Sequence, residues 1–370
     1  MAAKFQRRIE KAQRLMAEQD LDLLFVNNRE NVIYFTGLTQ IECLAVIIPR
    51  AGEACAVTLW LDTDYVRDQS GLTTYGYFFP QESLAAKCIE KMTAYGHRGP
   101  RIGFERYFVA FGVFDALRRA FPQENFVNAA DLFYRLRAIK DAGEISLMRR
   151  AGRIVAAGMA AAAGAVRPGV REYEVLAEAE YAMLKAGSDG SPFRPQVVSG
   201  DRALLTHPCA SDKAIASGEI TVIHLGATVQ GYAAKMCRTV AVGEVPKGRV
   251  EVYDVLLEAQ AAAIAALRPG VTADDVDGAA RRIVTAAGWE KHYLQQVGYG
   301  VGLRQSEFYP IIGQGRDEII EAGMVVDLLL PTIYRPDIGG PRVTDCIYVG
   351  ELANEILTDY PRQLIRVDIH

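Results

Sequence analysis

The chain has 370 residues, half of them hydrophobic, and a formal net charge of −4. A chain of this size buries a substantial core and predicts two domains, and its interspersed charges predict no nucleic-acid partner. No stretch approaches the roughly 18 apolar residues that a membrane helix needs, and the charged, amphipathic start differs from a signal peptide. The six cysteines lack paired spacing, which is typical of a reducing compartment. We therefore expect a soluble, cytoplasmic protein without a membrane partner.

The first third of the chain predicts an α/β layer. Apolar runs separated by polar, helix-like segments alternate there, and no glycine-rich phosphate loop follows any of them. We expect a first helix over 5–19, a helix over 109–120, and strands over 21–26, 43–49, 54–60, 101–105 and 125–130. A long helix is expected to begin in the charged segment 135–154. This change of pattern places the domain boundary so that the two domains are 1–134 and 135–370.

The second domain contains an internal repeat. Residues 156–187 match residues 257–288 in having an alanine-rich helix, the turn Arg-Pro-Gly-Val, a second helix with acidic residues in its first turn, and a closing Ala-Gly. The two turns begin 101 residues apart, at Arg167 and Arg268, since 268 − 167 = 101. Gly187 and Gly288 stand at equal offsets from these turns, as helix C-caps would. Two copies of one αα-β unit predict a pseudo-twofold domain with helices outside and a curved sheet inside.

A frame of short motifs follows each copy of the repeat. Residues 222–240 read VIHLGATVQGYAAKMCRTV, and GYGVG, GMVVDLLLP and RVTD follow at 298–302, 323–331 and 342–345. These motifs resemble the creatinase/prolidase/methionine-aminopeptidase family, whose metal-binding hairpin reads roughly v-x-D-x-G-(x)-G-Y-x-x-D-x-x-R-T. LDLLFVNNRENVIYFTG at 21–37 is similar to the start of the family's smaller domain. The resemblance implies an α/β (α+β) chain, in which a creatinase-like α/β domain precedes a pita-bread domain with a curved antiparallel sheet.

The positions that bind metal in that family carry other residues here. The two hairpin aspartates are replaced by His224 and Lys235, the histidine of GHG-x-G by Tyr299, the glutamate of R-x-E-D by Thr344, and the glutamate of the EP motif by a leucine. Hard dications need anionic oxygen ligands and a neutral histidine, and lysine has no acceptor to offer. The sequence therefore predicts a site without metal or other cofactor, whose positive or neutral lining attracts an anion or a polar neutral molecule.

The polar residues that remain are the candidate site residues. The resemblance implies proton transfer by His207, and a histidine with a pKa near 6.5 can serve as general acid or base. Glu307 stands where the family keeps a glutamate. The candidate catalytic residues are His207, His224, Lys235, Tyr299 and Glu307. The candidate substrate-binding residues are Thr344, Asp327, Asp345, Cys237 and Arg238.

Several of the candidate catalytic residues also have a purely structural interpretation. Lys235 could pair with Asp327 or Asp345 in an inert polar core, Tyr299 could fill space as an aromatic plug, and Glu307 could pair with a neighbouring cation. Against an inert core, buried charge is costly to keep. We expect Lys235 to contact an anionic substrate group, or to act as a base if burial lowers its pKa.

Two functions compete at this stage. The leading expectation is a metal-independent, creatinase-like hydrolase or lyase that cleaves a C–N bond in a small polar or anionic molecule, with His207 as general acid/base. The alternative is an Xaa-Pro aminopeptidase-like protein that is inactive and binds peptides or proteins. The missing ligands argue against a working metallopeptidase. The resemblance further implies a homodimer.

Overall fold

The structure is a computed structural model of the whole chain, and it describes residues 2–293, 296–330 and 333–368. The chain divides into two compact units, Met1–Arg137 and Ala138–His370. The predicted boundary after residue 134 lies inside the helix α6 (Ala130–Ala138). Each unit has its own sheet and its own core, as expected for a domain.

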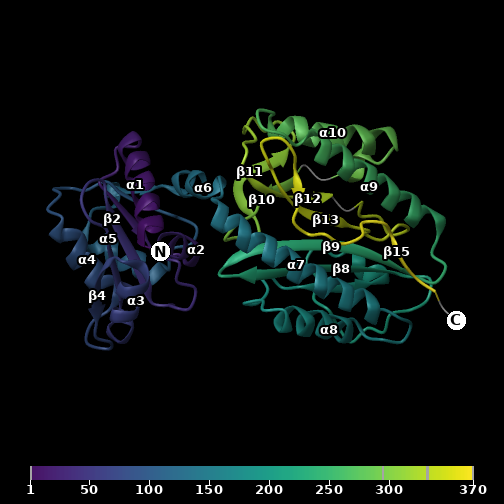
Figure 1. Cartoon of the computed structure of the whole chain (residues 1–370), viewed down its shortest axis with the longest axis horizontal. Helices are drawn as coiled ribbons and strands as arrows, with labels where there is room; N and C mark the ends of the chain where they lie inside the picture. Colours follow the sequence, from purple (N-terminus) through teal and green to yellow (C-terminus); the bar gives the residue numbers. More distant parts are fainter. Residues whose placement is uncertain (1, 294–295, 331–332, 369–370) are drawn as a thin grey trace. The chain divides into compact units, whose positions relative to one another are not determined.

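The N-terminal unit is built on a mixed sheet with the strand order β4-β3-β2-β1-β5-β6 (Figure 1). Its antiparallel pairs are β1–β2 and β2–β3, whereas β1–β5, β3–β4 and β5–β6 run parallel. The strands are β1 (Leu23–Val26), β2 (Leu44–Pro49), β3 (Cys55–Leu59), β4 (Thr73–Tyr77), β5 (Ile102–Phe104) and β6 (Phe126–Asn128). The helices are α1 (Ala2–Glu18), α2 (Arg29–Thr36), α3 (Thr63–Ser70), α4 (Leu84–Ala94) and α5 (Phe111–Ala120). The helices and strands predicted from the hydrophobic pattern are confirmed to within a few residues.

The predicted long helix at the start of the second domain is in fact two helices. Helix α6 ends at Ala138, and α7 (Ala142–Ala165) begins after three intervening residues. The Asp141 side chain accepts from the Glu144 amide at 2.9 Å, and the Glu144 carboxylate accepts from the Asp141 amide at 2.8 Å. This reciprocal capping box satisfies amides that a continuous helix would have paired internally. The charge pattern of 135–154 hid the break, because DAGE is compatible both with a helix interior and with a cap.

The C-terminal unit contains an antiparallel sheet whose main path is β11-β10-β12-β13-β9-β8-β7, with β14 paired to β13 and β15 running parallel to β9. Its strands are β7 (Gln196–Ser199), β8 (Ile220–Val229), β9 (Tyr232–Val242), β10 (Gln296–Gly300), β11 (Glu307–Gly313), β12 (Val325–Leu330), β13 (Val343–Tyr348), β14 (Glu355–Ile356) and β15 (Ile365–Val367). A short 3-10 helix, η3 (Gly200–Leu204), follows β7. This arrangement confirms the predicted fold class.

The predicted repeat is visible as two helix pairs that lie along the sheet (Figure 1). The first pair is α7 and α8 (Glu172–Lys185), and the second is α9 (Lys247–Ala266) and α10 (Ala273–Ala286). Gly187 and Gly288 follow the second helix of each pair with φ of 92° and 81°. These left-handed angles suit glycine, so the predicted C-caps are confirmed.

The sheet of the C-terminal unit has a helix-covered face and an inner face. Side chains alternate between the two faces along each strand. A cluster of buried residues joins α9 and α10 to even-numbered positions of β12 and odd-numbered positions of β13, among them Val326, Leu328, Val343 and Ile347. The remaining positions of these strands, and those level with them in the register, therefore form the inner face.

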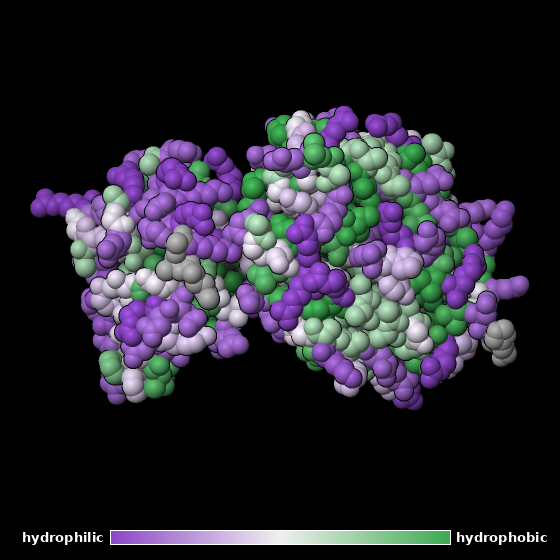
Figure 2. Space-filling model, viewed as in Figure 1, coloured by the Kyte–Doolittle hydropathy of each residue, from purple (hydrophilic) through white to green (hydrophobic). Residues whose placement is uncertain are grey.

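The surface of the chain is of mixed polarity (Figure 2), and its cysteines are unpaired. Over the face shown in Figure 2, hydrophilic residues lie among hydrophobic ones on both units. Among the described residues, no helix is long and apolar enough to cross a membrane. All six cysteines are free, and Cys43 and Cys209 are exposed while the other four are buried.

Candidate functional site

The replaced metal-ligand positions come together on the inner face of the sheet. The strand register places them in two adjacent rows that cross the strands. The first row contains Gln196, His224, Cys237 and Thr344, from β7, β8, β9 and β13. The second row contains Gly226, Lys235, Cys346, Asp327 and Tyr299. The side chain of the leucine that replaces the glutamate of the EP motif lies outside the described part of the structure. The sequence frame therefore predicted a real spatial cluster.

The centre of the second row is an ion pair between Lys235 and Asp327. The Lys235 ammonium lies 2.7 Å from Asp327 Oδ2, and the two side chains are 3% and 0% exposed. Lys235 Nζ also donates to Gln305 Oε1 at 3.2 Å and to Ser306 Oγ at 3.0 Å, so all three of its hydrogens have acceptors. Burial raises the pKa of the Asp327 carboxyl, and the adjacent ammonium opposes that rise. The structural alternative of a Lys235–Asp327 pair is thus realised.

A glycine makes room for a lid over this row. A Cβ on Gly226 would lie 2.5 Å from the Phe193 ring and 2.9 Å from the Pro192 ring, so no larger residue fits there. The Phe193 ring also packs on His224, with centroids 4.7 Å apart. The segment before β7 therefore covers part of the inner face.

Tyr299 contacts the ion pair through its backbone. Its amide donates to Asp327 Oδ1 at 2.7 Å, which leaves Asp327 bound on both oxygens. Its hydroxyl lies 3.5 Å from Gln296 Oε1 on its own strand. Burial, followed by the charge of Asp327, raises the pKa of the Tyr299 phenol, so at neutral pH this hydroxyl is a proton donor and not a metal ligand.

His224 lies in electropositive surroundings. Its Nε2 atom is buried and has no hydrogen-bond partner. Its pKa is lowered well below the usual value, first by burial and then by the charges of Lys235, Arg342 and His207. The imidazole is therefore neutral at physiological pH, with one ring nitrogen as donor and the other as acceptor.

Arg342 is a member of the site that the sequence analysis did not propose. Its side chain is 3% exposed. The guanidinium donates to Gln196 Oε1 at 3.0 Å, to Leu205 O at 2.6 Å and to Ala203 O at 3.2 Å. The signal was available, because Arg342 lies two residues before Thr344 and strand alternation puts both on one face.

Cys237 and Thr344 are buried neighbours in the first row. Burial raises the pKa of the Cys237 thiol to about 12, so a thiolate nucleophile is not available at neutral pH. The Thr344 hydroxyl is buried without a hydrogen-bond partner. Both residues lie on the inner face of the sheet, and their contact with a substrate stays a prediction.

Glu307 and His207 lie at the margins of the cluster. Glu307 begins β11 and is buried, and its Oε1 accepts from the Arg304 amide at 3.4 Å. His207 is exposed on the loop after η3. Its charge influences the pKa of His224, which places the loop near the first row.

Arg238 and Asp345 do not contribute to the inner face, contrary to prediction. They occupy the alternate positions of β9 and β13, so their side chains point toward the helix-covered face. Arg238 Nη2 lies 2.7 Å from Asp345 Oδ1, both side chains are fully buried, and Gln260 of α9 donates to Asp345 Oδ2 at 3.2 Å. The prediction failed because adjacent residues of a motif were assigned to one site, whereas strand geometry separates them.

The described residues do not form a site for a metal pair. No cluster of three or more histidine, cysteine, aspartate or glutamate side chains that could hold a metal ion occurs among them. An ammonium at 2.7 Å from Asp327 takes the carboxylate that a dication would need. The donor set therefore does not fit the pair of dications implied by the family resemblance.

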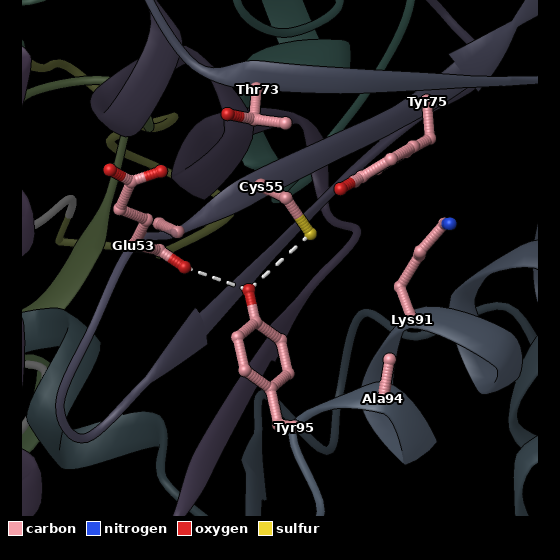
Figure 3. A pocket seen from close by; sticks show the side chains of 8 residues that line it. Glu53, Cys55, Thr73, Tyr75, Lys91, Ala94 and Tyr95 are labelled. Atoms are coloured by element: carbon pink, nitrogen blue, oxygen red, sulfur yellow. Dashed lines mark hydrogen bonds between the residues drawn. The ribbon is translucent and has the colours of Figure 1, made fainter.

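A separate hollow of about 230 Å³ lies in the N-terminal unit between β3, β4 and α4 (Figure 3). Tyr95 OH donates to Glu53 O at 2.8 Å and lies 3.5 Å from Cys55 Sγ. Lys91 Nζ lies over the Tyr75 ring, 3.8 Å from its centroid. Burial raises the pKa of the Cys55 thiol, so this hollow lacks an activated nucleophile.

The sheets of the two units place the chain in a class of two-domain proteins, in which a creatinase/prolidase-type domain precedes a pita-bread domain. Residues 8–139 match the creatinase/prolidase N-terminal domain, and residues 146–351 match metallopeptidase family M24. The chain belongs to metallopeptidase family M24, as the sequence motifs predicted. Peptidases such as those of this family are hydrolases.

Individual relatives span almost the whole chain. An uncharacterized peptidase, YqhT, of Bacillus subtilis is 31% identical over 361 residues, which cover 97% of this chain and 99% of the relative. An Xaa-Pro dipeptidase of Pyrococcus furiosus is 30% identical and is covered to 99%. The solved structure of an Xaa-Pro dipeptidase from Bacillus anthracis matches with a TM-score of 0.90 at 29% identity, over 98% of this chain and 100% of that one.

These relatives correct the expected function. The expectation of a metal-independent, creatinase-like hydrolase or lyase for a small polar or anionic molecule is wrong in its reaction type and substrate class, because the relatives are Xaa-Pro dipeptidases of a metallopeptidase family. The alternative, an inactive Xaa-Pro aminopeptidase-like protein, was closer to the substrate class of the relatives. Its expected inactivity has no support, because the relatives are named as peptidases. The error was physical as well: missing ligands describe a site's charge and do not identify its substrate.

Proposed function

We propose that this chain acts on Xaa-Pro dipeptides, the substrate class after which its relatives are named. The observation that carries the proposal is the gathering of the replaced ligand positions, in two rows of the inner face, around the Lys235–Asp327 pair. Polar and charged side chains were kept at positions where an unused cavity would more cheaply be apolar.

We propose further that Lys235 supplies the positive charge that a dication supplies in a metallopeptidase. An ammonium group can donate to the amide carbonyl oxygen as negative charge develops on it, a contribution typically worth about 10²–10³ in rate. Gln305 and Ser306 hold Nζ by neutral hydrogen bonds, which a substrate carbonyl can replace. His207, on the exposed loop, is the proposed proton-transfer group.

The experiment measures proline release from Ala-Pro by the purified full chain, before and after exhaustive chelation, together with elemental analysis. We expect release that chelation does not abolish, and less than stoichiometric manganese, cobalt or zinc. Lys235→Met should lower the rate at least 100-fold. Arg149→Met, which removes a surface cation paired with Glu355 at 2.6 Å, is the matched control and should act as the parent does.

Two results would overturn the proposal. Absence of both proline release and Xaa-Pro binding would remove the substrate class. Release that depends on a stoichiometric dication would remove the role of Lys235. If Lys235→Met does not fold, Lys235→Arg decides, because it keeps the charge and should retain part of the rate. The expected homodimer and cytoplasmic location stay predictions.

A further inference from the structure

Arg342 carries a buried positive charge that no carboxylate of the described residues balances. Its acceptors among the described residues are an amide oxygen and two backbone carbonyls, all neutral, and its Nε has no hydrogen-bond partner there. Within the described part of the chain, no acidic side chain lies within ion-pair distance of the guanidinium. Burying an unpaired guanidinium is costly, so the fold retains a cation that calls for a counter-charge.

The first row of the inner face, beside Arg342, contains a second polar group without a hydrogen-bond partner, the imidazole of His224. Gln196, which accepts from Arg342, lies directly opposite His224 in the β7–β8 register. The buried Nε2 of His224 also lacks a partner. The Thr344 hydroxyl, on the far side of Cys237 in the same row, is a third buried polar group without one.

The acidic groups of the neighbourhood are committed elsewhere. Asp327 pairs with Lys235 at 2.7 Å, and Asp345 pairs with Arg238 on the opposite face. The charged groups that act on His224 are Lys235, Arg342 and His207, all of them cationic when charged. Among the residues that the structure describes, an anion entering this space would meet donors and positive potential and no uncommitted carboxylate.

We propose that Arg342 and His224, with Thr344 at the edge, bind one small oxyanion on the inner face. Nη1 and Nη2 of Arg342 already donate to Gln196, Ala203 and Leu205, so the unpartnered Nε–H is a guanidinium donor left for an oxygen of a carboxylate, phosphate or sulfate. The neutral imidazole adds one N–H. The oxyanion is either a free inorganic ion or the carboxylate of a bound dipeptide. Only the second source rests on the proposed function.

The test titrates the full chain by calorimetry at constant ionic strength with phosphate, sulfate, Gly-Pro and glycyl-prolinamide, which lacks the carboxylate. We expect one saturable site for at least one inorganic oxyanion or for Gly-Pro, with at least tenfold weaker binding of the amide. Arg342→Met should abolish the oxyanion site, Arg342→Lys should weaken it, and His224→Gln should weaken it about tenfold. Arg149→Met is the control for loss of a cation elsewhere in the unit.

The outcomes separate this inference from the proposed function. Gly-Pro and its amide binding equally, with no effect of Arg342→Lys or His224→Gln, would leave the substrate class standing and make Arg342 a clamp between β13 and η3 only. If the Arg342 and His224 variants lose oxyanion binding while the parent neither binds nor hydrolyses Xaa-Pro dipeptides, the oxyanion site is supported and the proposed function is overturned. No saturable oxyanion in the parent chain overturns the inference. Should Arg342→Met not fold, the lysine and His224 variants decide.

Discussion

Each face of the C-terminal sheet buries an ion pair, and the two pairs differ in the groups that surround them. On the helix-covered face, Arg238 donates to Asp345 and also to the backbone carbonyls of Cys237, Thr344, Tyr360 and Pro361. Asp345 additionally accepts from Thr358 and Gln260. The pair joins two strands, a helix and the C-terminal segment into one network. Such a network has a structural role.

The inner-face pair is held mainly by side chains. Lys235 is contacted by Gln305 and Ser306, and its neighbours His224, Arg342 and Thr344 keep buried polar atoms without partners. Unsatisfied buried groups cost stability, so a face that retains several is organised for something other than stability. Burial alone therefore does not distinguish a structural pair from a functional one. The surrounding groups differ more: His224, Arg342 and Thr344 each have an unpartnered polar atom on the inner face, against Gln260 Oε1 beside Asp345 on the other.

The largest expected effect breaks the structural pair. Arg238→Met leaves Asp345 buried without its cation, which typically costs about 3–5 kcal/mol. Urea unfolding of the full chain, followed by circular dichroism, measures this loss. A change below about 1 kcal/mol would show that the helix-covered pair is not the structural anchor inferred from its network.

Breaking the inner pair should be partly reversible by a second substitution. Lys235→Met alone leaves Asp327 unpaired and should cost about 3 kcal/mol in the same assay. Adding Asp327→Asn removes the stranded charge, and the double variant should recover most of the loss, because neutral groups of similar size are cheap to bury. If the double variant is as unstable as the single one, Lys235 stabilises the sheet by packing and not by pairing.

The pH dependence of stability should carry the signature of His224. Its folded pKa is depressed, by burial first and then by Lys235, Arg342 and His207, so below about pH 6.5 the unfolded chain binds the proton more tightly. The stability contribution is present above that pH and is lost as the pH falls, by about 1.4 kcal/mol per pH unit. Unfolding free energies of the parent and His224→Gln, compared between pH 7.5 and 5, should diverge in this sense. Parallel curves would contradict a neutral buried His224.

The smallest expected effect concerns the lid over the inner face. Gly226→Ala would place a Cβ 2.5 Å from the Phe193 ring, and such overpacking typically costs about 1–3 kcal/mol. Gly164→Ala in α7 meets no atom within 4 Å and should be neutral or gain up to about 1 kcal/mol, since alanine favours a helix. Thermal unfolding compares the two. Equal effects would mean that Phe193 does not pack against the sheet at Gly226.

The substitutions at His224, Lys235, Tyr299 and Thr344 were visible in the sequence and changed the chemistry expected of the site. What they could not give was the partner of each residue. That Lys235 pairs with Asp327, and that Arg238 and Asp345 leave the site for the opposite face, depends on register across strands separated by more than 90 residues. Arg342 was missed for the same reason, although its alternation with Thr344 could have placed it.

The sequence by itself determined the family, the two-domain architecture and the repeat, because periodicity, turn glycines and motif spacing are local properties that survive without coordinates. It also determined that the metal-binding chemistry had changed, since that follows from residue types alone. Only the tertiary structure decided which charges are balanced and which are not. Charge balance depends on distances between strands brought together by the sheet, and no local pattern encodes those distances.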